Sequence, residues 1–169
     1  MVEASQDYSE AMKLESVNRF FNIHMKYNED SRNWNRDDFW ATPFESMIRG
    51  QGDCEDFAIT KFKTLLVLGI PEERLTLHHV NIVSRRSTVE IPHMVVVYET
   101  EEGESLVLDN IDARILPREE RNDLRTIIAF NTETLWVGHI ETEHSPEDKI
   151  SEWRNVISRF NNQLPLCKV

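Results

Sequence analysis

The sequence lacks most features of a disulfide scaffold or a membrane protein. Only two of its 169 residues are cysteines, Cys54 and Cys167. A chain of this length can bury a core without disulfides, although a single bridge between the two remains an alternative. No apolar run approaches the roughly 20 residues of a membrane span. Residues 1–6 are polar and lack the hydrophobic segment of a secretory signal.

Basic residues are also in the minority. The chain has 19 basic and 30 acidic residues, a formal net charge of −11. Such a surface argues against a phosphate-backbone partner and fits a protein that binds a cation. Hydrophobic residues make up 40% of the chain, which is enough to fold. We therefore expect a single domain over residues 1–169.

The periodicity of apolar residues predicts a mixed fold. Helical spacing is found over residues 9–26, 43–48, 54–68 and 145–164. Thr42 and Glu45 predict a capping box before the second of these helices, and the polar residues 28–38 are predicted to form a loop. Alternating or β-branched runs predict strands over residues 75–83, 93–100, 105–109, 126–130 and 135–137. Residues 84–90 are predicted to form an exposed connection, and the charged residues 117–124 a surface helical turn. This order predicts an α+β fold, with an antiparallel sheet between an N-terminal helical layer and a C-terminal helix.

The most informative stretch is Gly50–Asp56. Two glycines precede a cysteine that stands among three carboxylates at the start of the predicted central helix. The helix N-terminus stabilises a thiolate at Cys54, whereas Asp53, Glu55 and Asp56 raise the thiol pKa. A catalytic Cys54 therefore requires a positive group nearby, either an imidazolium or a divalent cation.

A cysteine nucleophile needs a base and an orienting partner for that base. His93 opens the most apolar predicted strand, so it stands out against His78 and His79. If Gly103 occupies the left-handed position of the following turn, His93 and Asp109 become diagonal neighbours on one face, about 7–8 Å apart.

Alternatives to these assignments remain. His93 also fits an edge histidine with satisfied hydrogen bonds. Asn110 and Asp112 are weaker candidates for the orienting partner, and Trp40 is a candidate for lining the cleft. The backbone N–H of Cys54 is expected to serve as one oxyanion donor, with Gln51 or Trp40 as candidates for the second.

The carboxylates beside Cys54 suggest calcium. Asp53, Glu55 and Asp56 offer hard oxygen ligands, and calcium accepts irregular geometry. The spacing is not that of an EF-hand, and zinc is disfavoured because no second cysteine or histidine pair lies close in sequence. The alternative is that these acidic residues only favour the helix dipole, with Asp53 as N-cap and Asp56 as capping-box acceptor.

Four sequence blocks lie within a span from Val17 to Val137, and they are Trp40–Pro43, Gly50–Ile59, Pro92–Val95 and Val107–Ile111. Together they resemble the bacterial transglutaminase-like cysteine proteinases. The Asp-Cys-Glu-Asp run is the most specific element when it is combined with the later His-Met and Leu-Asp-Asn runs. The resemblance implies a papain- or transglutaminase-like fold, a triad of Cys54, His93 and Asp109, and calcium held by Asp53, Glu55 and Asp56.

The resemblance further implies a biological role. Members of this kind are periplasmic endopeptidases that cut the N-terminal region of a large LapA-like surface adhesin at a di-alanine site. Cleavage releases the adhesin and disperses biofilm, and the periplasmic domain of a LapD-like cyclic di-GMP receptor sequesters the protease. Two other readings stay open: a transglutaminase-type acyl transferase with the same triad, and a non-catalytic calcium-dependent binding module.

Overall fold

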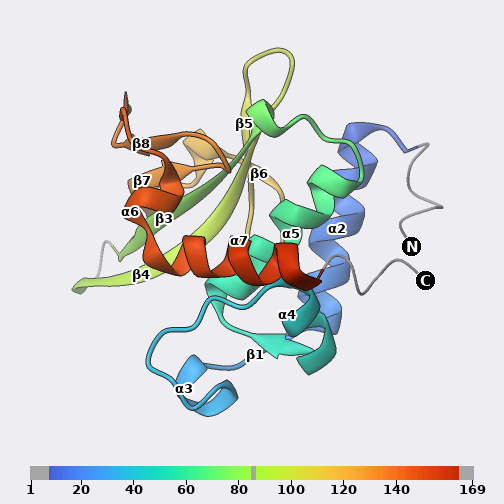
Figure 1. Cartoon of the computed structure of the whole chain (residues 1–169). Coiled ribbons are helices and arrows are strands. Elements are labelled where there is room, and N and C mark those ends of the chain that lie inside the picture. The colour runs from blue at the N-terminus through green and yellow to red at the C-terminus, as the bar shows by residue number, and fades with distance from the viewer. Residues whose placement is uncertain (1–7, 85–86, 164–169) are drawn as a thin grey trace.

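The computed structural model describes residues 8–84 and 87–163, which form a sheet with helices packed against it (Figure 1). Seven strands follow the order β6-β5-β4-β3-β7-β8-β9, and every pair of neighbours is antiparallel. The α+β prediction is therefore confirmed. The strands are β3 (Leu75–Ser84), β4 (Ser87–Glu99), β5 (Ser105–Leu108), β6 (Leu116–Pro117), β7 (Leu124–Phe130), β8 (Leu135–Val137) and β9 (Ile140–Glu141).

Helix α5 is the central helix, and it packs on β4 and β3 and against α2. Ala58, Phe62 and Leu65, predicted to share its buried face, are each at most 2% exposed. Among the described residues, no helix combines the length and the apolar character that crossing a bilayer requires. The helices are α2 (Glu10–His24), α3 (Asp30–Asn33), α4 (Pro43–Arg49), α5 (Cys54–Val67), α6 (Pro146–Lys149) and α7 (Ser151–Gln163).

The chain reaches Cys54 through a turn that its sequence specifies. Thr42 and Glu45 form the predicted capping box at the start of α4, and Gly50 ends that helix in the left-handed conformation at φ 66°. Gly52 is needed for a different reason. A Cβ placed there would lie 2.4 Å from Oδ2 of Asp56, so the glycine lets α5 begin close against the preceding backbone.

A two-stranded parallel pair joins the segment before α3 to the segment before α5. Strand β1 (Lys26–Tyr27) pairs with β2 (Gln51–Gly52). The side chains of Asn33 and Gln51 add a hydrogen bond of 2.9 Å between Nε2 of Gln51 and Oδ1 of Asn33. This pairing places α3, which follows β1, beside the start of α5.

The β4–β5 hairpin has the predicted register. Val96 pairs with Leu108 and Glu99 with Ser105, and Gly103 adopts φ 83° in the turn. Continued by one residue, this register sets Val95 opposite Asp109, which makes His93 and Asp109 diagonal neighbours.

Several local predictions were wrong. Strand β7 begins at Leu124 rather than at residue 126, and α3 lies within the predicted loop 28–38. Strand β4 begins at Ser87 rather than at His93, because it pairs with β3 beyond Pro92 as far as Ser84. The proline is tolerated because β5 pairs only with Val96–Glu99, which leaves β4 with one partner strand near Pro92. The C-terminal helix is divided, since Ile150 takes an extended conformation between α6 and α7. The predicted last residue of its apolar stripe, Leu164, lies outside the described residues, as does Cys167.

Candidate active site

Cys54 and His93 line the same cavity, with a volume of about 520 Å³. Cys54 is the first residue of α5, and His93 lies on β4 beneath that helix end. Trp40, predicted to line a cleft, and Met94 form apolar parts of the wall. The remaining wall is strongly acidic and includes Glu29, Asp30, Asp37, Asp38, Asp53 and Glu55. The structure thus brings the predicted nucleophile and the predicted base to one opening.

His93 is hydrogen-bonded to Asp109 beneath this cavity. Its Nε2 lies 2.8 Å from Oδ1 of Asp109, and the two residues are 3% and 1% exposed. Burial alone would raise the pKa of the Asp109 carboxyl, but His93, the Ile111 N–H and the Arg121 guanidinium lower it to about 2. Because an ionised carboxylate only accepts hydrogen bonds, Nε2 carries the proton and Nδ1 is the basic nitrogen.

The groups around Cys54 favour the protonated thiol over the thiolate. Burial, followed by the charges of Glu55 and Asp53, raises its pKa, and a hydrogen bond from the Met94 backbone opposes this only in part. The Cys54 thiol donates a hydrogen bond to Oε2 of Glu55, with 3.0 Å between sulfur and oxygen. The local carboxylates therefore suppress the nucleophile unless positive charge offsets them, as the sequence indicated.

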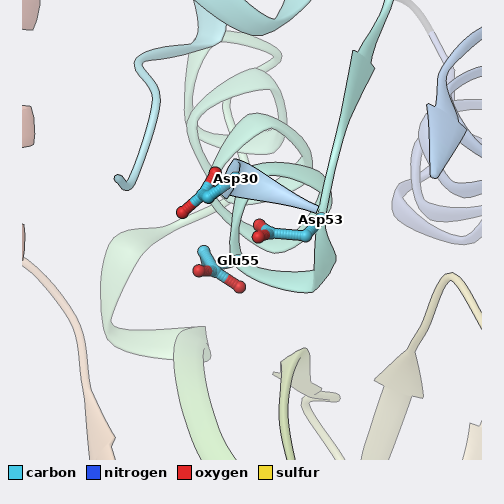
Figure 2. A group of neighbouring side chains, drawn as sticks. All are labelled: Asp30, Asp53 and Glu55. Atoms are coloured by element: carbon cyan, nitrogen blue, oxygen red, sulfur yellow. The ribbon is translucent and has the colours of Figure 1, made fainter. Parts of the chain in front are cut away.

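Three carboxylates from two segments converge next to Cys54 (Figure 2). Asp30, Asp53 and Glu55 each place an oxygen within 4.8 Å of the other two. Burial, followed mainly by neighbouring acidic groups, raises the pKa of Asp30 to about 6 and that of Asp53 to about 10. Oδ1 of Asp30 and Oδ1 of Asp53 are buried without a hydrogen-bond partner. This donor set fits a hard divalent cation such as calcium.

Asp56, the third ligand predicted from sequence, does not join this group. It is fully buried, and its Oδ1 accepts a hydrogen bond of 2.7 Å from the Ala41 N–H. Asp56 thus ties the start of α5 to the chain before α4. Asp53 occupies the predicted N-cap position, but its side chain makes no capping hydrogen bond.

Asp30 was not identified from the sequence. It lies in a polar stretch predicted to be a loop, where acidic residues are common and carry little information. Its position depends on the pairing of β1 with β2, which is a contact between distant segments. Its other oxygen, Oδ2, accepts the Phe39 N–H and holds α3 in place.

Three of the weaker candidates, His78, Asp112 and Gln51, make their contacts away from the pair of His93 and Asp109. His78 bonds to the hydroxyl groups of Thr76 and Thr126, and burial lowers its pKa to about 4. Asp112 pairs with Arg114 at 2.7 Å. The Gln51 amide donates to Asn33. His79 does line the cavity, but no contact of its ring with Asp109 is found in the described structure.

The comparisons assign the chain to a family. The profile described as "Bacterial transglutaminase-like cysteine proteinase BTLCP" matches residues 2–136. The protein belongs to this family of cysteine proteinases, as its fold and sequence blocks indicated. A search of curated proteins finds no match.

Solved structures of LapG from Legionella pneumophila are similar to it. One shares 33% sequence identity and a TM-score of 0.78, covering 94% of this chain and 82% of that one. The EGTA-treated form shares 32% identity and a TM-score of 0.80, covering 94% and 83%. The calcium-bound form shares 34% identity and a TM-score of 0.78, covering 94% and 84%. A relative of this fold therefore binds calcium.

Proposed function

We propose that the protein is a calcium-dependent cysteine endopeptidase with Cys54 as nucleophile, His93 as base and Asp109 as the residue that orients the base. The observation that carries this proposal is the 2.8 Å contact between His93 and Asp109 at the cavity that Cys54 also lines. A buried histidine with one fixed nitrogen and one basic nitrogen is what an activated thiol requires.

The mechanism follows from the tautomer of His93. Nδ1 accepts the proton of Cys54, and the thiolate attacks the scissile carbonyl carbon. Asp109 keeps the proton on Nε2 and stabilises the imidazolium that forms. The Cys54 N–H, at the first turn of α5, donates to the oxyanion. The imidazolium then protonates the leaving amine, and water activated by Nδ1 hydrolyses the thioester.

Asp30, Asp53 and Glu55 would hold the calcium ion, with carbonyl groups and water completing its ligands. The ion supplies positive charge beside carboxylates that otherwise oppose thiolate formation. Two of these residues were proposed from the sequence. Asp30 replaces Asp56 as the third proposed ligand, because Asp56 lies outside this group and accepts a hydrogen bond from the Ala41 N–H.

For the substrate we propose the N-terminal region of a large surface adhesin, cut at a di-alanine site. Cleavage would release the adhesin and control biofilm dispersal, and the location would be periplasmic. A LapD-like cyclic di-GMP receptor is the proposed regulator. The support for these points is the resemblance to the family, whereas the proposed chemistry rests on the site itself.

The test is incubation with an N-terminal adhesin fragment, with calcium or with EGTA, followed by gel electrophoresis and mass spectrometry. We expect one cut between two alanines, loss of the cut in EGTA, and recovery on adding calcium. Cys54→Ala should abolish cleavage while the circular dichroism spectrum stays unchanged. Cleavage by the Cys54→Ala variant would show that Cys54 is not the nucleophile. Incorporation of a labelled primary amine into the substrate would indicate a transglutaminase instead.

A further inference from the structure

Asp109 contacts a second buried charge besides His93. Its Oδ2 lies 2.9 Å from Nη2 of Arg121, and the side chains of these two residues are 0% and 5% exposed. Water screens such a pair far less than it screens a surface ion pair. Each carboxylate oxygen of Asp109 thus has its own partner, His93 on one side and Arg121 on the other.

Arg121 is held in one orientation by its surroundings. Its Nε and Nη2 donate to the two carboxylate oxygens of Asp123, each at 2.9 Å. Its backbone carbonyl accepts from Nη1 of Arg118 at 2.9 Å. A planar guanidinium bound through two nitrogens to one carboxylate has little freedom to rotate. It therefore presents Nη2 to Asp109 at a fixed position.

The contact with Arg121 favours the ionised form of Asp109. Burial raises the pKa of this carboxyl, whereas His93, the Ile111 N–H and the Arg121 guanidinium together lower it to about 2. If Asp109 were protonated, its own O–H could donate a hydrogen bond to His93. Asp109 would then no longer act only as the acceptor of the Nε2 proton.

We propose that Arg121 is a positioning residue for the reaction, because it holds the Asp109 carboxylate in the charged state and orientation that fix the His93 tautomer. This inference rests on the proposed function for its effect on turnover. Arg121 belongs to the charged stretch 117–124 that the sequence predicted to be a surface turn, and it is only 4% exposed.

A purely structural role for Arg121 can be separated from this one. The backbone carbonyl of Asp109 accepts from Nζ of Lys61 at 2.9 Å and from Nδ2 of Asn22 at 2.8 Å. The backbone position of Asp109 is therefore fixed by α5 and α2, independently of Arg121. Removing the guanidinium should disturb the carboxylate while the strand end stays in place.

The experiment compares Arg121→Gln, Arg121→Lys and Arg125→Gln in the calcium-loaded full chain. Arg125→Gln is the matched control, because it removes the same charge from an exposed pair with Glu90. With the adhesin fragment as substrate, Arg121→Gln should lower kcat by on the order of 100-fold. KM should stay within about twofold. Arg121→Lys should recover part of the loss, and Arg125→Gln should match the wild type.

A second measurement does not depend on turnover. Nitrogen-15 NMR of the His93 ring reports which nitrogen carries the proton, and Arg121→Gln should convert a single tautomer into a mixture. A wild-type kcat and a wild-type ring spectrum in folded Arg121→Gln would overturn the inference. If Arg121→Gln fails to fold, the same two readouts are taken on Arg121→Lys, and an unchanged ring spectrum and kcat there overturn it. If the wild type cleaves nothing while the ring tautomer still depends on Arg121, the proposed function fails and the positioning role stands.

Discussion

The buried carboxylates near Cys54 differ in the groups that contact them. Asp109 contacts an imidazole and a guanidinium, and Asp56 accepts the Ala41 N–H. Asp30, Asp53 and Asp56 each retain a buried oxygen without a hydrogen-bond partner, but only Asp30 and Asp53 lie in the group with Glu55. Burying charge without a partner is costly, so this group is where an added cation stabilises the protein most. The proposed pair of His93 and Asp109 is thus complete within the chain, whereas the proposed metal site depends on an added cation.

The metal assignment predicts a ligand-dependent change in thermal stability. At a calcium concentration 100-fold above its dissociation constant, the gain is about 2.7 kcal/mol, or a rise in Tm of about 5–10 °C. Asp30→Asn should reduce this rise to less than half, measured by calorimetry with calcium and with EGTA. In EGTA the variant should melt no lower than the wild type, because it relieves carboxylate repulsion.

Asp37→Asn is the matched control for Asp30→Asn. Asp37 lines the same cavity but is not part of the three-carboxylate group, so its variant should keep the full calcium-induced rise. If Asp30→Asn keeps the full calcium-induced rise in Tm, Asp30 is not a calcium ligand, and Asp56 is again the candidate for the third ligand.

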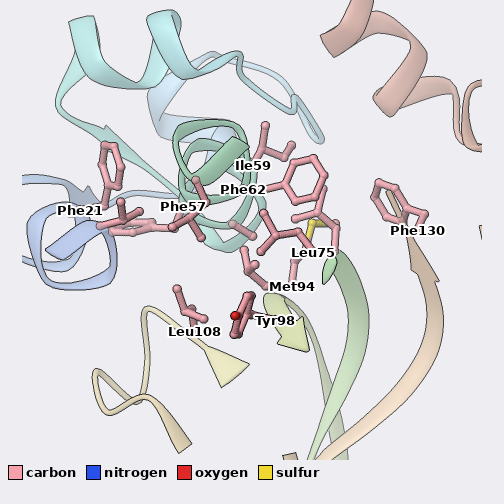
Figure 3. Packing of buried hydrophobic residues seen from close by; sticks show 14 of the residues in the cluster. Phe21, Phe57, Ile59, Phe62, Leu75, Met94, Tyr98, Leu108 and Phe130 are labelled. Carbon is pink, nitrogen blue, oxygen red and sulfur yellow. The ribbon is translucent and has the colours of Figure 1, made fainter. Parts of the chain in front are cut away.

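At the scale of elements, α5 connects the two halves of the site. Its start carries Cys54, and its middle carries Lys61, whose Nζ bonds to Asn18 and to the Asp109 carbonyl. Figure 3 shows Phe57, Ile59 and Phe62 of this helix packed among residues of the surrounding elements. Because α5 is packed within the core, it links the position of Cys54 at its start to the backbone of Asp109, which Lys61 contacts.

The buried position of Lys61 predicts a pH-dependent stability. Burial lowers its pKa from 10.5 to about 7 in the folded protein. Between pH 7 and 10.5 the unfolded chain binds more protons at this site, so the wild type should gain up to ~1.4 kcal/mol per pH unit. Urea unfolding at pH 6.5 and pH 9 should show a gain of about 2 kcal/mol for the wild type relative to Lys61→Met. Parallel pH profiles of the two proteins would contradict this explanation.

Elements were predictable from sequence where a local signal was strong. The capping box at Thr42 and the turn at Gly103 gave the start of α4 and the register of the β4–β5 hairpin. The start of β4 was missed, because Pro92 is a local stop signal that pairing with β3 overrides. The interruption at Ile150 was missed because the apolar stripe continues across it in sequence.

At the scale of the whole molecule, the site combines predictable and unpredictable parts. Cys54 and His93 lie in runs that stand out by composition, and hairpin register links His93 to Asp109. Asp30 and Arg121 reach the site through contacts between distant segments, and each lies in a charged stretch without periodicity. Net charge predicted an acidic surface, and the cavity wall beside Cys54 is acidic, but length and net charge carry no information about the adhesin or the regulator.

The measurement that tests the central claim most directly is the alkylation rate of Cys54 by iodoacetamide at neutral pH in the calcium-loaded protein. Mass spectrometry of the peptide that contains Cys54 distinguishes it from Cys167. If His93 and Asp109 activate this thiol, it should react at least roughly tenfold faster in the wild type than in His93→Ala. Equal rates in the two proteins, with calcium bound to both, would contradict the assignment of Cys54 and His93 as a catalytic pair.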